Sequence, residues 1–414
     1  MTLTGTPFLL LLVALMVLAP VATLLLWNRI AGPAVVRTVS RLGLLVACQV
    51  LAVSTLAASV NDYAYFYGSW SEVFSSAGLM VGGAPQFSTH TALMPANTLS
   101  PYGRLSAQPD RHFSSPAQYR SRGQLAKVQI NGSISQLSTP AYVYLPPQYF
   151  QARYAHTSFP ASLVITGYPS THKMLVKRLQ MHNVLLHQLQ HHRAGPMVLV
   201  MMRPDVTFPR DTECTDVPGG PQVQTFMAQD IPTVIGHRYR VNARGWGAIG
   251  VSTGGYCATK IAMTYPSTFH AAVSISGYYF SLLDRSTGDL WGGSRVVRNL
   301  NSPTWRLAHL PAPPISLLIT SSRGQLGLEG LSDMQRFVAH ARPPLSITTL
   351  VERSGGHNFN TWKSELPMTL SWLYAHLPPP SSAVGARGAN TARAETDGKT
   401  PVVRVQPSAS VGIP

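Results

Sequence analysis

Residues 246–255 read WGAIGVSTGG, and residues 256–265 continue as YCATKIAMTY. Ser252 is the centre of a G-x-S-x-G pattern that begins at Gly250 and ends at Gly254. This pattern presents a serine nucleophile on a sharp turn when a strand precedes it and a helical segment follows it. Side chains at positions 250 and 254 would collide there with neighbouring segments of the same chain. The pattern therefore predicts that Ser252 is a catalytic nucleophile.

A glycine-rich turn that merely packs closely, or that cradles a phosphate, is the alternative interpretation. The sequence has no Walker-type lysine spacing at this turn, and G-V-S-T-G-G does not match G-x-G-x-x-G. The nucleophile is the favoured interpretation.

The sequence from 123 to 377 alternates short apolar stretches with longer helical ones. Residues 123–130 and 141–150 are predicted to pair as opening strands, with a turn at Asn131-Gly132. Later strands are expected at 162–166, 196–202, 245–251, 271–276, 315–320 and 346–352, and helices at 173–190, 222–239, 257–265, 332–341 and 361–377. Strands that alternate with helices predict an α/β fold with a mostly parallel sheet flanked by helices.

A serine nucleophile needs a base and an acid that follow it in the chain in the order acid, then histidine. His357 comes after the strand expected at 346–352, on a glycine-bearing loop, and is the predicted base. The loop after the strand at 315–320 offers Glu329 and Asp333 as the acid. Asp333 falls in the first turn of a predicted helix, where a carboxylate is favourable for structural reasons alone. We expect Glu329 to be the acid, with Asp333 as the alternative.

The oxyanion formed on attack needs two backbone N–H donors. Thr253, the residue after the serine, is predicted to supply one donor. The loop after the strand at 162–166 is predicted to supply the other through Tyr168, because Pro169 has no N–H.

Two cysteines fall in the α/β part of the chain, Cys214 and Cys257. Cys214 follows the strand at 196–202 and Cys257 lies five residues after Ser252, so both should lie at the carboxyl edge of a parallel sheet. We expect a disulfide between them, with two free buried thiols as the alternative. The third cysteine, Cys48, lies in an apolar run.

Three stretches of the chain resemble the esterase branch of the α/β-hydrolase fold, which includes S-formylglutathione hydrolase-like esterases and secreted mycolyltransferases. They are ITGYP, GVSTGGYCATKIAMTYPSTFHAAVSISG and SGGHNFNTWKSELPMTLSWL, within residues 124–377. The resemblance implies an α/β-hydrolase fold and acyl-enzyme chemistry. The chain departs from the family where many members carry an acid, because the stretch there reads SSRGQ.

Residues 8–27 and 42–60 are two nearly uncharged runs, each about long enough to cross a bilayer. Arg29, Arg37 and Arg41 lie between them, so the positive-inside bias places this short connection in the cytoplasm and both ends outside. Tyr63, Tyr65, Phe66, Tyr67 and Trp70 follow the second run, as in an interfacial aromatic belt. A two-helix transmembrane hairpin in residues 1–70 is therefore expected. Two buried helices of a soluble domain are the alternative.

The expected domains are this hairpin at 1–70, a flexible linker at 71–118, the catalytic domain at 119–377 and a disordered tail at 378–414. The linker and the tail are rich in Ser, Pro, Gly and Ala. The net charge of +16 is dispersed and suits an anionic envelope surface, but it does not indicate nucleic acid as a partner. No cofactor is predicted. No metal is predicted either, because the histidines at 182–192 lack the H-E-x-x-H pattern.

Together these features predict a membrane-anchored, extracytoplasmic serine esterase acting on a small-molecule or lipid ester. An acyltransferase could use the same acyl-enzyme, with an alcohol in place of water. A catalytically inactive envelope binding protein is the third possibility, and the intact serine and histidine argue against it.

Overall fold

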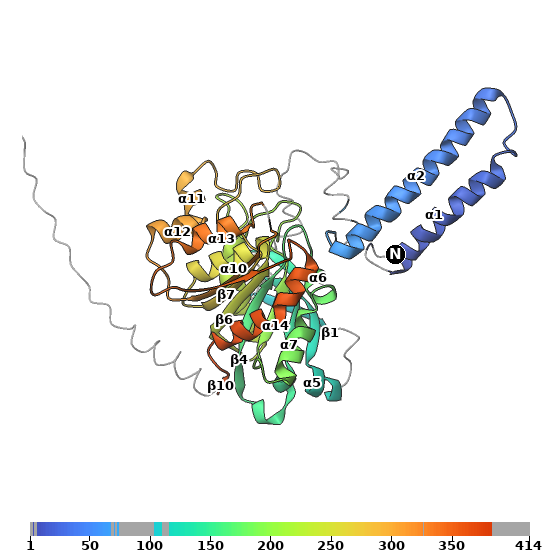
Figure 1. Cartoon of the computed structure of the whole chain (residues 1–414). Coiled ribbons are helices and arrows are strands. Elements are labelled where there is room, and N and C mark those ends of the chain that lie inside the picture. The colour runs from blue at the N-terminus through green and yellow to red at the C-terminus, as the bar shows by residue number, and fades with distance from the viewer. Residues whose placement is uncertain are drawn as a thin grey trace, which may run out of the picture.

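The computed structural model describes residues 3, 6–67, 70, 73, 103–109, 116–325 and 327–382. Two parts are visible in Figure 1: a pair of long antiparallel helices, and an α/β body whose sheet is covered by helices on both faces. Of the expected tail at 378–414, residues 383–414 lie outside the described residues, as does most of the expected linker.

The described part of the body is built on one ten-stranded sheet with the order β1-β2-β3-β5-β4-β6-β7-β8-β9. β1, β2, β3 and β5 pair in antiparallel fashion, and every pair from β5 to β9 is parallel, so the predicted mostly parallel sheet is confirmed. The strands are β1 (Arg104–Pro109), β2 (Gln124–Asn131), β3 (Ser138–Leu145), β4 (Thr157–Ile165), β5 (Val198–Met202), β6 (Val241–Val251), β7 (Phe269–Ile275), β8 (Ser316–Ser322), β9 (Ser346–Glu352) and β10 (Ser381–Ser382), which pairs with the start of β4.

Helices cover the two faces of this sheet and create two separate apolar cores. Successive side chains of a strand point to opposite faces, so Trp246 and Ala248 of β6 enter one core while Ile249 and Val251 enter the other. α9, α10, α12 and α13 pack on the first face, and α6, α7 and α14 pack on the second. The helices are α5 (Pro116–Arg122), α6 (Lys173–Lys177), α7 (Met181–Gln190), α8 (Val223–Thr225), α9 (Ile231–Arg238), α10 (Thr253–Thr264), α11 (Arg295–Leu300), α12 (Pro303–His309), α13 (Leu331–Val338) and α14 (Phe359–Ala375).

Two predicted helices are interrupted. The helix expected at 173–190 is α6 followed by α7, with Gln180 in the left-handed region between them at φ 51°. The helix expected at 222–239 contains a π-helical turn, η4 (Phe226–Asp230), between α8 and α9. Pro232 has no N–H to donate to the carbonyl one turn earlier, which accounts for the irregular bonding at this point.

The predicted boundary between linker and catalytic domain is wrong. Residues 104–109 were expected in the linker but form β1, which pairs along its whole length with Ala126–Asn131 of β2. The turn after β2 is also longer than the predicted two residues, and the carboxylate of Asp230 accepts the N–H groups of Ile134 and Ser135 there. Both features depend on segments distant in sequence, which local patterns do not reveal.

The two apolar runs form α1 (Thr6–Leu26) and α2 (Ala34–Ala64), each long and apolar enough to cross a membrane. Their apolar side chains are mostly exposed. Polar side chains on the helices form hydrogen bonds within a helix or between the two helices. Thr55 Oγ1 of α2 lies within hydrogen-bond distance of the carbonyl of Leu51 in the same helix and of Leu12 in α1. α2 extends beyond the predicted 42–60 because a helix continues through Arg37 and Arg41 without needing apolar side chains there.

Candidate active site

Ser252 lies between β6 and α10, in a sharp turn. Its backbone has φ 55° and ψ −124°, a conformation that a residue with a side chain rarely adopts. A Cβ at position 250 would lie 2.1 Å from the carbonyl oxygen of Gly254, and a Cβ at position 254 would lie 2.3 Å from that of Ile165. A larger residue at position 250 would therefore open the turn itself, and one at position 254 would push the turn away from the end of β4.

The loop that follows β4 lies directly against Ser252. A Cβ at Gly167 would be 3.0 Å from Ser252 Cβ and 3.5 Å from Ser252 Oγ. Tyr168 comes next, and its phenol donates to the carbonyl of Pro209 at 2.8 Å. Thr253 is the first residue of α10, so no helical carbonyl precedes its amide. The two predicted oxyanion donors therefore come from segments that meet at the serine.

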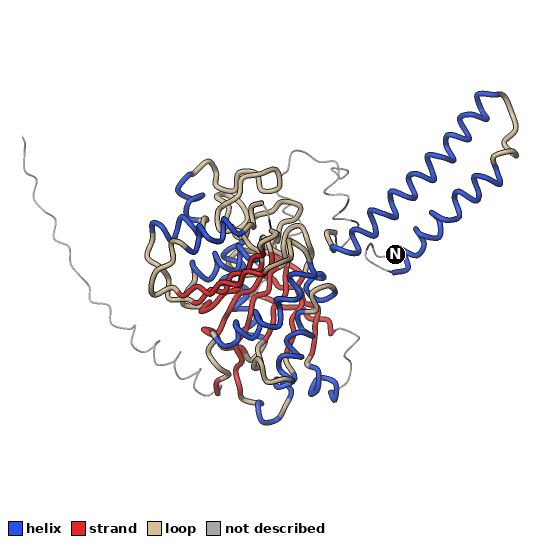
Figure 2. Tube along the Cα trace, in the orientation of Figure 1, coloured by secondary structure: helices blue, strands red, loops and turns tan. Residues whose placement is uncertain are grey.

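His357 lies in the loop between β9 and α14, at the same carboxyl edge of the sheet as Ser252. Figure 2 shows the loops gathered at this end of the strands. Its ring packs edge-to-face on Trp362 at 4.9 Å. His357 as a residue is exposed, yet desolvation by the surrounding protein lowers its pKa, while the charge of Glu329 acts in the opposite direction. Within the described residues no hydrogen bond joins His357 to Ser252 Oγ.

A side chain that the sequence analysis does not single out lies within hydrogen-bond distance of His357 Nδ1. Gln325 Nε2 lies 3.3 Å from Nδ1, and this glutamine is buried at the end of the SSRGQ stretch after β8. The amide oxygen of Gln325 has no hydrogen-bond partner among the described residues. Rotation of the amide by 180° would exchange its nitrogen and oxygen, so that the oxygen could accept a proton from Nδ1.

The two candidate acids differ in their surroundings. Asp333 is buried at the start of α13, where Oδ2 accepts the backbone N–H of Tyr279 at 2.8 Å and Oδ1 lies 3.4 Å from Arg336. Glu329 is half-buried in the loop before α13, and its charge acts on His357. Asp333 is thus committed to holding the segment after β7. Among the residues that the structure describes, no hydrogen bond or ion pair joins either carboxylate to His357.

A disulfide joins Cys214 to Cys257, with 5.7 Å between the Cα atoms, as the sequence predicted. It connects the loop after β5 to α10, five residues from Ser252. Closing a loop of this length stabilises the folded chain by about 4 kcal/mol on the chain-entropy estimate.

Buried titratable side chains fix the same loop beside the disulfide. Lys260 of α10 is fully buried, and its Nζ donates to the carbonyl of Glu213, to Thr215 Oγ1 and to Asn301 Oδ1. The Glu213 carboxylate accepts the phenol of Tyr278 at 2.7 Å. Burial raises the pKa of Glu213 and lowers that of Lys260. These polar contacts join three loops of the carboxyl edge to the helix that carries the serine.

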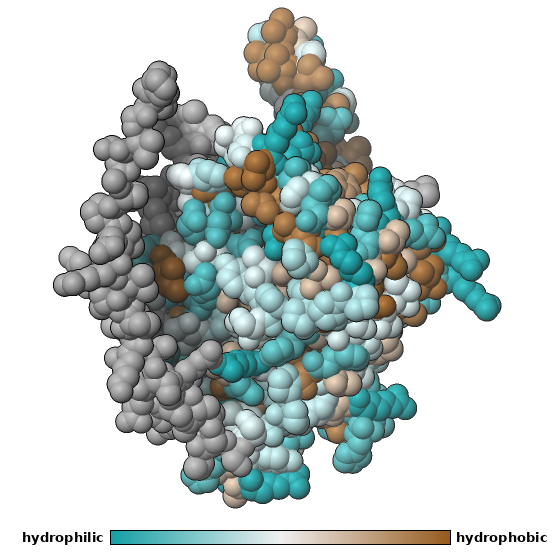
Figure 3. Space-filling model, turned by 90° about the vertical axis from the view of Figure 1, so that its left-hand side faces the viewer, coloured by the Kyte–Doolittle hydropathy of each residue, from teal (hydrophilic) through white to brown (hydrophobic). Residues whose placement is uncertain are grey.

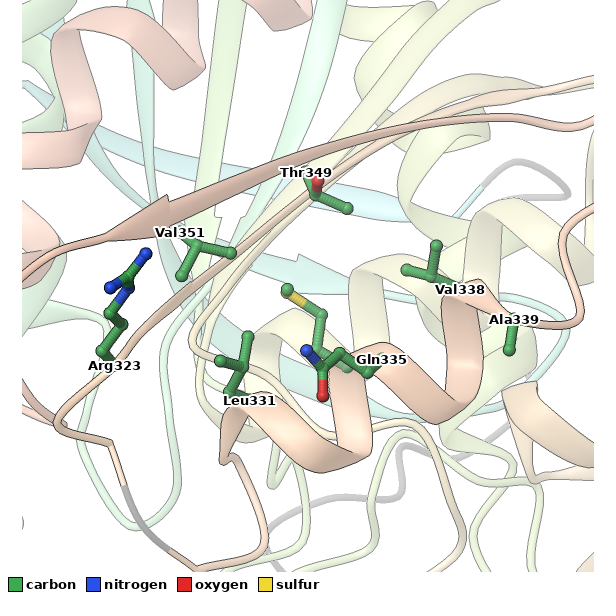
Figure 4. Close-up of a pocket in the computed structure, with 8 residues that line it drawn as sticks. Arg323, Leu331, Gln335, Val338, Ala339, Thr349 and Val351 are labelled. Atoms are coloured by element: carbon green, nitrogen blue, oxygen red, sulfur yellow. The ribbon is translucent and has the colours of Figure 1, made fainter.

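The part of the chain that the structure describes contains no cluster of three or more His, Cys, Asp or Glu side chains suited to a metal. A groove of 490 Å³ lies between α13 and β9, with Leu331, Met334 and Val351 among its lining residues (Figure 4). It contains neither Ser252 nor His357, so we assign no substrate to it.

Comparison with known proteins agrees with this geometry. Residues 135–373 match the model of a family described as "Putative esterase". The chain belongs to this esterase family. An uncharacterised protein of Corynebacterium glutamicum is 23% identical over 272 residues, which cover 61% of this chain and 62% of that protein.

Solved structures show the fold. An S-formylglutathione hydrolase from Agrobacterium tumefaciens superimposes with a TM-score of 0.53 at 15% identity, covering 66% of this chain and 99% of that one. An S-formylglutathione hydrolase from Staphylococcus aureus gives a TM-score of 0.46 at 13% identity, with 66% and 99% covered. The match to the Agrobacterium structure shows that the body has the α/β-hydrolase fold that the sequence resemblance implies.

The contact between Gly254 and β4 can be tested by substitution. We expect Gly254→Ala to destabilise the fold by about 1–3 kcal/mol or more, because the added methyl would meet the backbone carbonyl oxygens of Ile165 and Thr166. Gly236→Ala in α9 is the control: its Cβ meets nothing within 4 Å, and it should be neutral or stabilising by up to about 1 kcal/mol. Thermal unfolding of both full-length variants measures the difference. Equal melting temperatures would contradict the close contact.

Proposed function

We propose that the protein is a membrane-anchored serine hydrolase that cleaves carboxylic esters through an acyl-enzyme on Ser252. The strained backbone of Ser252 at the strand–helix junction is the observation that carries this proposal. Such strain is costly and persists at functional sites because the surrounding structure enforces it. Membership of the esterase family supports the same chemistry.

In this mechanism Ser252 Oγ attacks the ester carbonyl and gives its proton to His357. The oxyanion accepts hydrogen bonds from the amides of Thr253 and Tyr168. The bond to the alcohol then breaks, and His357 passes the proton to the leaving oxygen. Water attacks the acyl-enzyme by the same route and releases the acid, with Ser252 regenerated.

We propose hydrolysis rather than transfer to another alcohol because His357 is exposed to solvent. Water can therefore reach the base that must activate it. The acyltransferase alternative needs an acceptor site for an alcohol that displaces this water.

The histidine needs a partner that stabilises its charged form. We propose that Glu329 provides the negative charge and that Gln325 orients the ring through Nδ1. The 3.3 Å contact between Gln325 Nε2 and His357 Nδ1 supports the orienting role of Gln325, and the effect of Glu329 on the pKa of His357 supports its electrostatic role. Asp333 is excluded from this proposal because its oxygens hold Tyr279 and Arg336.

The helical pair supports membrane anchoring, since both helices are long, apolar and mostly exposed. We propose that they span the membrane with the short connection in the cytoplasm. Arg29, Arg37 and Arg41 lie at that end, and Arg41 donates to the carbonyl of Trp27 at 3.0 Å. The catalytic body would then lie outside the cell.

Removing the nucleophile tests the proposal directly. We expect Ser252→Ala to lower hydrolysis of 4-methylumbelliferyl acetate by about 10³-fold or more, and His357→Ala to be similarly damaging, because the two residues act as one unit. Reaction with a fluorophosphonate probe should disappear in Ser252→Ala while the melting temperature stays that of the unaltered protein. Undiminished turnover in a pure preparation of this variant would remove the assignment.

The assignment of Glu329 rather than Asp333 as the acid predicts which of two substitutions lowers kcat/KM more. We expect Glu329→Gln to lower kcat/KM by about tenfold, less than the roughly 10⁴-fold loss seen when a carboxylate bonded directly to the histidine is replaced. Asp333→Asn should leave kcat/KM within about twofold and instead lower stability by about 1 kcal/mol. Steady-state kinetics and thermal melting measure the two effects. The opposite order in kcat/KM would transfer the acid role to Asp333.

The position of Gln325 predicts a gain of function. His357 must be neutral to act as base, so kcat/KM rises with pH through its pKa, and the lowered pKa puts that midpoint below about 6.5. We expect Gln325→Glu to place a carboxylate against Nδ1, moving the midpoint up by about 1–3 pH units and raising the plateau. Gln335→Glu, on the exposed side of α13, is the control. A pH–rate profile unaffected by Gln325→Glu would argue against contact with His357.

A further inference from the structure

The last turn of α2 is hydrogen-bonded to the loop that follows β4. Ser170 Oγ donates to the carbonyl of Ala64 at 3.0 Å, and the backbone N–H of Thr171 donates to the carbonyl of Tyr65 at 2.8 Å. Thr166 Oγ1 closes the loop by donating to the carbonyl of Ser170 at 2.8 Å. This loop carries the amide of Tyr168, so one side of the candidate active site is bonded to the end of the helix.

A second contact joins the end of α2 to the histidine side of the site. Arg178 Nε donates to the carbonyl of Tyr63 at 2.7 Å, Nη2 donates to that of Asp62 at 3.2 Å, and the guanidinium lies 4.5 Å from the centre of the Tyr63 ring. The same ring packs edge-to-face on Phe359 at 5.4 Å. Phe359 begins α14, two residues after His357. Tyr63 thus contacts both Arg178 at the end of α6 and Phe359 at the start of α14.

A third contact reaches the loop after β5. The Tyr67 ring packs edge-to-face on Phe208 at 5.9 Å, and the backbone of Tyr67 is held by both amide atoms of Asn61. Tyr168 donates to Pro209 in the same loop. The sequence places Tyr63 and Tyr67 where an interfacial aromatic belt would be; in the structure both rings contact the body.

The contacts lie close to the level where the apolar part of α2 ends. Val60 is still 47% exposed, and Asp62 comes two residues later. The carbonyl of Asp62, which accepts a hydrogen bond from Arg178, lies about 3 Å beyond Val60 along the helix axis, at about 1.5 Å per residue. The polar layer on each side of a bilayer is about 5–8 Å deep. In a membrane-spanning hairpin, the loops around Ser252 therefore lie against this layer. Figure 3 shows the hairpin rising above the body with a largely apolar surface.

We propose that the substrate is an amphiphilic carboxylic ester that stays in the membrane while it reacts, and that the end of α2 forms the wall of the site facing the bilayer. This inference rests on the proposed esterase function and on the hairpin spanning the membrane. An ester group of such a molecule lies near the boundary between chains and headgroups. It can reach Ser252 without withdrawal of its acyl chain into water, whereas a freely soluble ester gains nothing from this arrangement.

The test uses two esters with the same leaving group. Full-length protein is reconstituted in vesicles of phosphatidylcholine and phosphatidylglycerol, and kcat/KM is measured with 4-methylumbelliferyl oleate, which partitions into the bilayer, and with the water-soluble acetate. Arg178→Met removes the two hydrogen bonds to the end of α2. We expect it to lower kcat/KM for the oleate at least tenfold and to leave the acetate within threefold.

Arg193→Met is the matched control, because Arg193 is an exposed arginine beyond the end of α7, at the opposite edge of the sheet. It should leave both activities unchanged. Tyr63→Leu is the second variant, in case Arg178→Met does not fold, and it should show the same selective loss. The rate of fluorophosphonate labelling checks that Ser252 stays reactive in each variant.

An equal fall in both activities would overturn the proposal, since the contact would then only support the fold of the site. Unchanged activity on the oleate in Arg178→Met would also overturn it. Failure of the esterase function gives a different result: the unaltered protein would hydrolyse neither ester and would not react with the fluorophosphonate.

Discussion

The close approach of the Ser252 turn to β4 is the constraint on which the rest of the site depends. Gly250 and Gly254 allow the backbone of the turn to contact itself and the end of β4 within distances that no side chain permits. Because the turn cannot move away, the loop after β4 must pass directly over the serine, which brings Gly167 against Ser252. The helix that follows then starts at a fixed position and carries Cys257 and Lys260 to the neighbouring loops.

The loops of the carboxyl edge are held by groups that water would otherwise solvate. Lys260 and Glu213 are buried, and each is satisfied by several specific partners rather than by one another's charge alone. Breaking one partner would leave a buried group unpaired, at a cost far above that of a surface contact. The disulfide acts in parallel by limiting how far the unfolded chain can separate these segments. Fixed loops allow the amides at the serine to be positioned before substrate binds.

Sequence patterns predicted the features that local chemistry determines. The Ser252 turn follows from glycine spacing, the order of strands and helices follows from apolar periodicity, and the Cys214–Cys257 pair follows from the common edge of a parallel sheet. Contacts made between distant segments were missed. β1 is a strand because β2 pairs with it, and its own sequence has no such signal. The sequence did not predict a role for Gln325, because a glutamine is rarely a member of a catalytic triad. The absence of an acid from SSRGQ was the signal in the sequence that this stretch differs from the family.

The end of α2 shows why an apolar run alone gives an incomplete prediction. Hydropathy identifies a span, and aromatic residues after it suggest an interface, but neither indicates what those residues touch. A simple anchor only limits the distance between a body and the membrane, and it leaves the orientation of the body free. Bonds from Ala64 and Tyr65 to the loop after β4, together with Arg178 and Phe359 around Tyr63, remove that freedom. The orientation of the body relative to the helices is therefore fixed on both sides of the candidate site. This matters for a substrate that is itself oriented, as an ester in a bilayer is.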